Sequence, residues 1–348
     1  MSECNVIAIG DWDADGTVAV ALVKYSQVVL NSYPVKGKCG FTSLPAGPRS
    51  LDSVIEDLEC PDVLLILDIP YTDSVGKALE SFRSRCDSTR IIYVDHHRST
   101  ISSASKIEDT YKTEVITGVT PTSVLLYNIL RSLGLTVTPR LKEFTKAVGI
   151  LEHSSRYVEN SVSRKMVDLA ASISKALNAE HDPLLWQRFV DWLASPLPFD
   201  EFKFKPKSPG YQSKMAVTEF SQKIADERDK ELKEASRELA MSAQNLGYIK
   251  FIDARNKWRK RGATALASKI YSVVKAPVAL LVSTAEGQPL LIIRAGRGMA
   301  QRIIDYLDVQ GVIEDKGGHG NIAMARLRED VSIEKLKALL RRAVVSSI

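Results

Sequence analysis

The sequence predicts an α/β protein that combines a doubly wound, mainly parallel sheet with a smaller α/β domain, joined by a long helix. Short apolar runs alternate with helix-forming segments in the first part of the chain, which is the pattern of repeated β-α-β units. A charged, helix-forming stretch covers residues 213–244, and strand-like runs begin again near Tyr248. The length of 348 residues also exceeds the usual size of a single hydrophobic core.

These patterns divide the chain into a first domain over residues 1–185, a linker with the long helix over 186–246, and a second domain over 247–348. The contents of 45% hydrophobic and 26% charged residues are typical of a soluble globular protein. Because no apolar stretch is long enough to span a bilayer and no signal-like segment begins the chain, we expect a cytoplasmic protein with no membrane partner. The net charge of +5 permits an anionic partner without requiring one.

The four cysteines all lie in the first quarter of the chain and show no Cys-x-x-Cys spacing: Cys4, Cys39, Cys60 and Cys86. A structural zinc site or a disulfide framework would call for closely spaced pairs or nearby histidines. We therefore expect buried, reduced thiols without a chemical role.

Three apolar runs in the first domain each end on acidic or histidine side chains. The run at 7–9 is followed by Asp11, Asp13 and Asp15, the run at 63–67 by Asp68, and the run at 91–94 by Asp95, His96 and His97. Because the carboxyl ends of parallel strands meet at one edge of a sheet, these side chains are expected to converge there. The pattern predicts a metal site rich in carboxylate oxygens.

The loop that carries the first three acids has a competing interpretation, because Asp-x-Asp-x-Asp-Gly also begins calcium-binding loops. Such a loop needs a glutamate at its twelfth position and a preceding helix, whereas Leu22 stands at that position and a strand precedes. The loop does not match either common phosphate-binding glycine pattern. Its chemistry is therefore expected to reside in the carboxylates.

The remaining segments of the first domain have less specific patterns. We expect a loop at Ser99–Lys106 and a helix that begins near Thr120-Pro121-Thr122-Ser123, whose hydroxyls either cap the helix or help its N-terminus contact a phosphate. Another apolar run, Phe144–Leu151, leads into Glu152 and His153. Further helices are expected at Val18–Tyr25, Leu51–Leu58 and Thr72–Arg85.

The second domain contains a glycine-rich turn with a histidine, Gly317-Gly318-His319-Gly320, which we expect to precede a helix at Ile322–Arg328. Such a turn exposes backbone N–H groups that suit a phosphate. Arg294 and Arg297 follow a neighbouring strand, so an anion pocket is predicted from His319, Gly317, Gly318, Arg294 and Arg297. Taken alone, His319 is more typical of a surface histidine.

These motifs together resemble the DHH phosphoesterase superfamily. The set consists of Asp11-Trp12-Asp13-Ala14-Asp15-Gly16, Asp68-Ile69-Pro70, Asp95-His96-His97 and the distal Gly317-Gly318-His319-Gly320, and its order and spacing agree across nearly the whole chain. The superfamily includes RecJ-like nucleases, and the tail resembles the DHH-associated C-terminal domain, with an archaeal type expected. The resemblance implies a metal-dependent phosphodiesterase or exonuclease that hydrolyses short single-stranded RNA or DNA to nucleoside monophosphates.

The resemblance also implies a set of metal ligands: Asp11, Asp13, Asp15, Asp68, Asp95, His96, Glu152 and His153. At one point the chain departs from the family, in which a strand end supplies an aspartate four residues after a glycine. Counting from Gly149 places His153 there, with Glu152 beside it. Since histidine cannot bridge two ions through a carboxylate, the second metal site is in doubt unless Glu152 replaces the aspartate. The histidine that many relatives carry before the first aspartate is also missing, because Ala8 and Ile9 stand there.

Clustered carboxylates with imidazoles favour Mn²⁺, with Mg²⁺ as the alternative, and two such ions about 4 Å apart can promote hydrolysis of a phosphodiester. We expect Asp95, His96 and His97 to form the catalytic group. His97 is a ligand, a general acid near the leaving group, or a partner that orients a ligand.

Three functions remain open at this point. Hydrolysis of short oligonucleotides is the leading hypothesis, because the two-domain length without a recognised further nucleic-acid-binding domain favours short substrates over long DNA. Hydrolysis of a cyclic dinucleotide or a bisphosphorylated nucleotide would use the same site with a different pocket. A catalytically silent scaffold, as in RecJ-like relatives associated with the replicative helicase, is the third. Sugar preference, direction of attack and a possible homodimer are left undetermined by the sequence.

Overall fold

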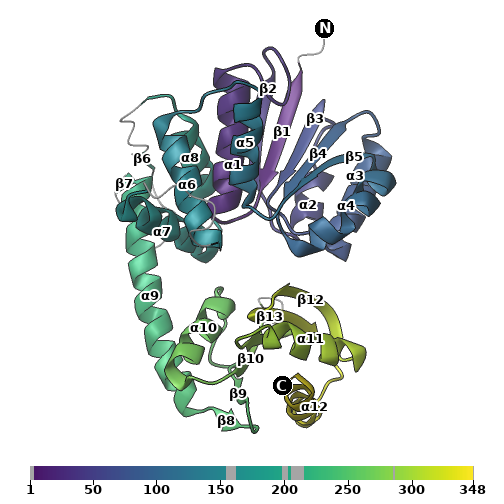
Figure 1. The fold of residues 1–348 in the computed structure, drawn as a ribbon, viewed down its shortest axis with the longest axis vertical. Coiled ribbons are helices and arrows are strands. Elements are labelled where there is room, and N and C mark those ends of the chain that lie inside the picture. The colour runs from purple at the N-terminus through teal and green to yellow at the C-terminus, as the bar shows by residue number, and fades with distance from the viewer. Residues whose placement is uncertain (1–3, 154–161, 198–202, 205–214, 285–286, 348) are drawn as a thin grey trace. The chain divides into compact units, whose positions relative to one another are not determined.

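The computed structural model describes residues 4–153, 162–197, 203–204, 215–284 and 287–347 (Figure 1). The chain forms two compact units, Met1–Ala225 and Asp226–Ile348, and each is described by itself. The boundary at residue 186 that the sequence suggested falls inside a helix of the first unit, where Trp186 is fully buried.

The first unit is built on a sheet of five parallel strands in the order β2-β1-β3-β4-β5 (Figure 1). The strands are β1 (Asn5–Gly10), β2 (Gly40–Pro45), β3 (Val63–Leu67), β4 (Arg90–Asp95) and β5 (Thr113–Thr117). The chain moves outward from β1 to β2 and then returns to the other side of β1, so the strand order reverses between β1 and β3. In doubly wound sheets, ligands bind outside the carboxyl ends of the strands at such a reversal.

Both faces of this sheet are covered by helices, which confirms the doubly wound architecture. Alternate residues of the strands explain the two layers, since Val6 and Ala8 pack on one side while Ile7 and Ile9 pack on the other. The first layer contains α1 (Ala14–Lys24), α5 (Thr122–Ser132), α6 (Pro139–His153), α7 (Arg164–Glu180) and α8 (Pro183–Ala194). The second contains α2 (Leu51–Glu56), α3 (Asp73–Arg85) and α4 (Arg98–Tyr111).

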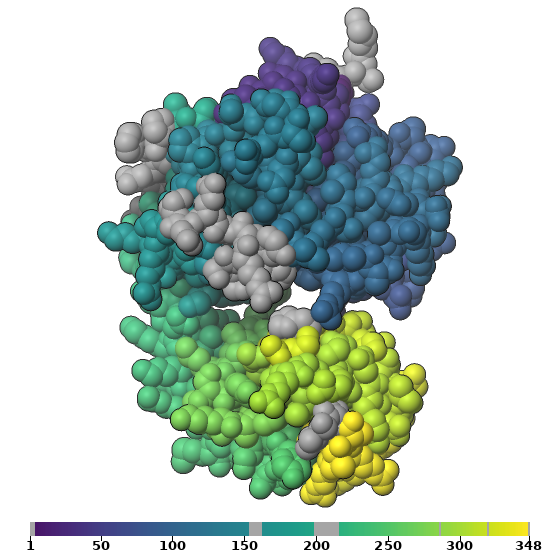
Figure 2. Space-filling model, viewed as in Figure 1, coloured from purple at the N-terminus to yellow at the C-terminus, as the bar shows by residue number. Residues whose placement is uncertain are grey.

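Helix α1 lies inside this first layer. Every residue from Ala14 to Val23 is buried, because α5 and α8 pack against α1 on the sides that the sheet leaves open. A helix that is apolar on all sides is typical of a core position. In Figure 2 the purple N-terminal residues adjoin the teal residues of this layer, although the two lie far apart in the sequence. A short π-helical turn, Tyr25–Val29, follows α1.

The second unit contains a six-stranded mixed sheet in the order β12-β13-β11-β10-β9-β8. Among the strand pairs described in this sheet, only β9 and β10 pair in parallel, with α10 between them in the chain. Helices α11 and α12 pack on one face, and α10 with part of α9 packs on the other. The elements are α9 (Val217–Met241), β8 (Gln244–Asn245), β9 (Lys250–Asp253), α10 (Ala263–Val274), β10 (Val278–Ser283), β11 (Pro289–Arg294), α11 (Met299–Val309), β12 (Ile313–His319), β13 (Ile322–Leu327) and α12 (Ile333–Ser347).

The expected long helix corresponds to α9, which begins in the first unit and ends in the second. Before it, β6 (Lys203–Phe204) and β7 (Met215–Ala216) form a small antiparallel pair. Of the helices described, none is both long enough and apolar enough to cross a membrane.

Three expectations about local structure were wrong. The segment Ser99–Lys106 is not a loop but part of α4, which begins at Arg98 directly after the histidines. The run at Phe144–Leu151, for which the family resemblance implied a strand end, is part of the helix α6, and its buried residues Phe144, Ala147 and Val148 follow the spacing of one helix face. The segment after the glycine-rich turn is not a helix but strand β13.

The expectation of free thiols was also wrong. Cys4 pairs with Cys39 and Cys60 pairs with Cys86, with Cα–Cα distances of 4.7 and 5.4 Å. Cys4, Cys39 and Cys60 each precede a strand of the first sheet, and Cys86 ends α3 shortly before β4. Both disulfides therefore lie toward the edge of the sheet where its strands begin.

Candidate metal centre

The predicted acids come together at the opposite edge, where the strands end. Asp11, Asp13 and Asp15 follow β1, Asp68 follows β3, and Asp95 is the last residue of β4. Strands β1 and β3 are the pair between which the strand order reverses. The cluster therefore occupies the position at which doubly wound sheets bind their ligands.

The loop after β1 is held by its own hydrogen bonds. Asp13 caps α1 by accepting from Gly16 N at 3.0 Å, and Asp11 Oδ1 accepts from Trp12 N at 2.8 Å. Trp186 Nε1 donates to Asp11 O at 3.0 Å and ties the loop to α8. Gly16 is required here because a Cβ atom would lie 2.5 Å from Asp11 N.

Asp15, Asp68 and His96 form the buried side of the cluster. The two carboxylates are each only 1% exposed, and His96 Nε2 lies 3.4 Å from Asp68 Oδ1 and 3.8 Å from Asp15 Oδ2. Asp68 has φ of +63°, a left-handed conformation that non-glycine residues adopt at a cost, often at functional sites.

Asp95 and His97 form the more open side. His97 Nδ1 lies 2.8 Å from Asp95 Oδ1, and the His97 side chain is 40% exposed while Asp95 is fully buried. Thr100 Oγ1 donates a hydrogen bond to Asp95 Oδ2 and accepts one from Tyr71 N at 2.9 Å. These bonds fix the orientation of the Asp95 carboxylate. Burial alone would lower the pKa of His97, but the hydrogen bond to Asp95 and the charges of nearby acids raise that pKa to about 9.

The acids repel one another strongly. Burial, with repulsion from Asp13, raises the pKa of Asp11 to about 8, and burial also raises the pKa values of Asp13, Asp15 and Asp68. For Asp68 the next largest causes are the charges of Asp15 and Asp13. A cluster of this kind becomes ionised at neutral pH when a cation neutralises it.

The available donor atoms fit a divalent cation. Asp68, His96 and His97 each offer a ligand atom, and these atoms lie within 4.8 Å of one another. The surrounding atoms are carboxylate oxygens, and the four cysteines of the chain are bound in disulfides. Oxygen and imidazole donors without thiolates suit Mn²⁺ or Mg²⁺.

The position at which the resemblance implied a further acid has a different local structure from the one expected. Glu152 and His153 end the helix α6 rather than a strand. Burial, together with repulsion from Asp13 and Asp15, raises the pKa of Glu152 to about 8, so this carboxyl is close enough to the cluster to interact with it. The side chain of His153 lies outside the described residues.

In the second unit, the residues of the predicted anion pocket lie in two adjoining turns. Arg294 ends β11, and its Nη1 donates to Asn321 O at 2.7 Å in the turn between β12 and β13. Asn321 Oδ1 in turn accepts from Gly298 N at 3.3 Å, at the start of α11. Gly320 also faces Gly298, since a Cβ atom on Gly320 would lie 3.3 Å from Gly298 Cα.

Arg297 lies in the first of these turns with φ of +57°. Gly317, Gly318 and His319 end β12 at the second turn, where Gly318 needs the freedom of glycine because its φ is +112° and a Cβ atom would meet Ile322 O at 2.5 Å. The expected helix N-terminus is absent here, because β13 follows the turn. The side chain of His319 lies outside the described residues.

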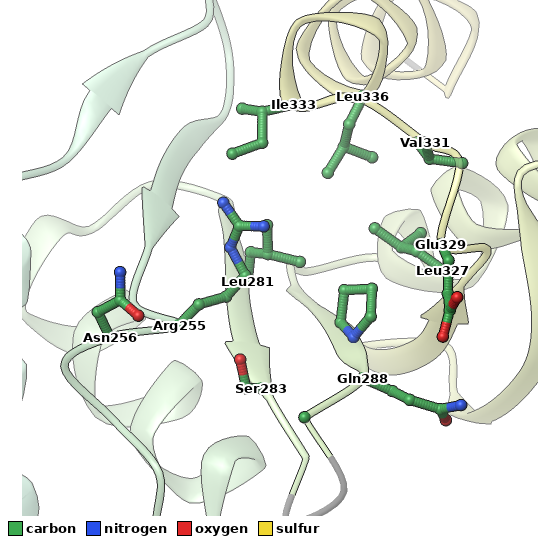
Figure 3. A pocket seen from close by; sticks show the side chains of 12 residues that line it. Arg255, Asn256, Leu281, Ser283, Gln288, Leu327, Glu329, Val331, Ile333 and Leu336 are labelled. Atoms are coloured by element: carbon green, nitrogen blue, oxygen red, sulfur yellow. The ribbon is translucent and has the colours of Figure 1, made fainter.

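A cavity of about 510 Å³ opens elsewhere in the second unit, at the carboxyl ends of β9 and β10 (Figure 3). It is lined by Arg255, Ser283 and Glu329 with apolar residues such as Leu281 and Leu336, and by none of the predicted site residues. The Arg255 guanidinium is held by Asp253 at 2.7 and 2.9 Å. The buried like charges converge instead at the acidic cluster, at the reversal of strand order.

Two residues that hold the acids were not recognised in the sequence as part of the site. Thr100 lies in the segment that was expected to be a loop. Thr122 was considered only as a helix cap or a phosphate contact, whereas its backbone N–H and its hydroxyl donate to Asp15 and Asp68. The hydroxyl residues near the start of α5 could have indicated a role in holding the acids. Their acidic partners are distant in the sequence, so the pairing could not be inferred from it.

No protein-family model matches this sequence, and no curated protein matches it significantly. Solved structures do match. RecJ from Thermus thermophilus in complex with Mn²⁺ is 15% identical with a TM-score of 0.65, and the match covers 98% of this chain and 52% of that one. This chain thus spans about half the length of that RecJ.

Two further structures match over nearly their whole length. PggH from Vibrio cholerae, a pGpG-specific phosphodiesterase, is 10% identical with a TM-score of 0.51, and the match covers 99% of both chains. CDC45 from Entamoeba histolytica is 10% identical with a TM-score of 0.50, and the match covers 98% of this chain and 95% of that one. Together with the parallel sheet and the position of its acidic cluster, these matches show that the chain has a RecJ-like fold.

Proposed function

We propose that this protein is a divalent-metal-dependent phosphodiesterase. The observation that carries the proposal is the convergence of Asp13, Asp15, Asp68 and Asp95 with two histidines at the carboxyl edge of the sheet. The similarity to RecJ with Mn²⁺ and to the phosphodiesterase PggH supports the same reaction class.

The proposed ligands are Asp11, Asp13, Asp15, Asp68, Asp95 and His96, with Glu152 as the candidate for the position that the family fills with aspartate. A bound Mn²⁺ or Mg²⁺ pair would activate water and neutralise charge on the phosphate oxygens. The protein's own contribution is to hold these carboxylates in place in a largely buried edge, so that they need not reorganise when substrate arrives.

His97 is the group best suited to transfer a proton. In the metal-free protein, the effect of burial is outweighed by the hydrogen bond to Asp95 and the nearby acidic charges, which raise the pKa of His97 to about 9 and so favour the protonated ring. Its side chain is 40% exposed and therefore accessible from solvent. Asp95 fixes the ring through Nδ1, so Nε2 is the atom that would donate a proton to the leaving oxygen. This arrangement suits a general-acid role for His97, and the same ring also offers a ligand atom beside Asp68 and His96.

We propose short linear oligonucleotides as substrates, yielding nucleoside monophosphates. The pGpG-specific PggH matches this chain over 99% of both lengths, whereas this chain spans about half of the Thermus RecJ. In the second unit, the proposed phosphate-binding residues are those of the two adjoining turns, Arg294, Arg297, Gly317, Gly318 and His319. Cyclic dinucleotides and bisphosphorylated nucleotides are the alternative substrates.

The test is a product assay with Mn²⁺ and with Mg²⁺ on a linear dinucleotide, a longer single strand, a cyclic dinucleotide and a bisphosphorylated nucleotide. We expect the dinucleotide to be hydrolysed fastest. Asp68→Asn should lower kcat at least about 100-fold, because even partners of metal ligands cost 10–100-fold when removed. Asp109→Asn, an exposed acid on α4, is the matched control and should retain activity.

A catalytically silent scaffold is the second candidate, and the similarity to CDC45 is the observation that allows it. If the purified wild-type protein hydrolyses none of these substrates with either ion, the phosphodiesterase proposal is wrong and the scaffold is favoured.

A further inference from the structure

The start of α5 lacks a cap from its own sequence. Pro121 occupies the N-cap position and makes no side-chain cap hydrogen bond. The first free N–H groups of the helix, on Thr122 and Ser123, donate instead to Asp15 Oδ2 at 2.7 Å and Asp15 Oδ1 at 2.9 Å. A carboxylate at this position is stabilised by the positive end of the helix. It also occupies the N–H groups that a phosphate would otherwise contact.

Thr122 makes a second connection. Its Oγ1 donates to Asp68 Oδ1 at 2.9 Å, so this one residue contacts carboxylates that follow two different strands, β1 and β3. Thr122 is fully buried, and Asp15 and Asp68 are each 1% exposed. Water therefore contributes little to fixing either side chain, and the hydrogen bonds from α5 decide where their oxygens lie.

The same oxygens face His96. Its Nε2 lies 3.4 Å from Asp68 Oδ1, which Thr122 Oγ1 also contacts, and 3.8 Å from Asp15 Oδ2, which Thr122 N also contacts. Without donors at this point, the buried carboxylates of Asp15, in the first turn of α1, and Asp68, just after β3, would turn apart, since their charges repel each other.

We propose that Thr122, with the first turn of α5, is a positioning residue that holds Asp15 and Asp68 so that both can bind one divalent cation. This inference rests on the proposed function, because it assigns a role to Thr122 only if the cluster binds metal. The hydroxyl orients Asp68, and the two backbone N–H groups orient Asp15. Each carboxylate oxygen keeps further lone pairs for a cation, because a hydrogen bond uses only one.

The test compares Thr122→Val and Thr122→Ala, which remove the hydroxyl, with Thr122→Ser, which keeps it. Thr89→Val is the matched control, because Thr89 is also buried and its Oγ1 donates to Pro61 O at 2.7 Å near the edge where the strands begin. Two quantities are measured on the full chain: the Mn²⁺ dissociation constant by isothermal titration calorimetry without substrate, and the melting temperature.

We expect Thr122→Val and Thr122→Ala to weaken Mn²⁺ binding about 10-fold or more, and Thr122→Ser to stay within about twofold of the wild type. Thr89→Val should lower the melting temperature without changing Mn²⁺ affinity. If both hydroxyl-deleting variants fold and bind Mn²⁺ like the wild type, the positioning role is wrong. If the wild type itself binds no Mn²⁺, the proposed function fails, and the role of Thr122 fails with it.

Discussion

The two disulfides are predicted to stabilise the first unit without affecting its acidic cluster. Cys4–Cys39 closes a loop with a sequence separation of 35, and Cys60–Cys86 closes one of 26. In the chain-entropy treatment, loops of these lengths correspond to about 3.8 and about 3.5 kcal/mol. For a unit of this size, 1 kcal/mol shifts the melting temperature by roughly 2–4 °C, so each disulfide should contribute roughly 7–15 °C.

The assay compares wild-type protein before and after reduction with dithiothreitol, measuring the melting temperature by circular dichroism and Mn²⁺ affinity by calorimetry. The double variants Cys4→Ser/Cys39→Ser and Cys60→Ser/Cys86→Ala separate the two contributions; alanine is chosen at Cys86 because that side chain is buried. A protein in which all four cysteines are replaced is the control for effects of the reductant itself. We expect a lower melting temperature and unchanged affinity.

The pairing is refuted if denatured, unreduced protein titrates four thiols, which is the number of cysteines in the chain. The entropic argument is refuted separately if the disulfides are present but reduction leaves the melting temperature unchanged. The spatial argument is refuted if reduction weakens Mn²⁺ binding, because both disulfides lie toward the edge where the strands begin.

Two further predictions concern stability. In the metal-free folded protein, the pKa values of Asp11 and Glu152 are raised to about 8 and that of His97 to about 9, so the folded protein binds more protons than the unfolded chain. The metal-free protein should therefore lose stability as the pH rises from about 5 to about 9. A melting temperature of the metal-free protein that rises over this pH range would contradict the prediction. Arg83→Met should lower the free energy of unfolding, measured with urea, by about 2 kcal/mol or more. The reason is that Arg83 donates hydrogen bonds to the carbonyl oxygens of Tyr111, Asp87, Thr89 and Lys112. The control Lys77→Met, at an exposed position on the same helix, should leave the free energy of unfolding nearly unchanged.

The parallel sheet was predictable because its strands are buried on both faces. The runs at 63–67 and 91–94 contain only apolar or aromatic residues, and each stops at an acid. That acid marks the strand end in the sequence, so both the sheet and the edge that carries the site could be inferred together. Five of the acids that were expected to converge do follow β1, β3 and β4 in this way.

The errors came where local pattern and tertiary context disagree. Strand β13 reads Ile-Ala-Met-Ala-Arg-Leu, which is rich in helix formers, but its buried residues Ala323, Ala325 and Leu327 alternate as in a half-buried strand. In α6, the closely spaced apolar residues of 147–151 hid the helical spacing of its buried positions. Periodicity alone cannot separate short buried strands from buried helices.

The disulfides and the hydrogen bonds of Thr122 could not be derived from the sequence for a different reason. Both depend on which strand lies beside which. Cys4 and Cys39 approach each other because β1 and β2 are neighbours that begin at the same edge, and Thr122 reaches Asp15 across 107 positions of sequence. Such pairings follow from the topology, which spacing along the chain does not reveal.

Every residue of helix α1 from Ala14 to Val23 is buried, and the first turn of the helix is capped by Asp13 of the acidic loop. A larger side chain at any of these interior positions cannot turn toward solvent, so it must displace either the sheet or a neighbouring helix. In a saturation library, this stretch should therefore tolerate almost no enlargement. Substitutions such as Ala19→Leu or Ala21→Leu should also change the geometry of the acidic cluster, by shifting the start of the helix and with it the carboxylates that precede it.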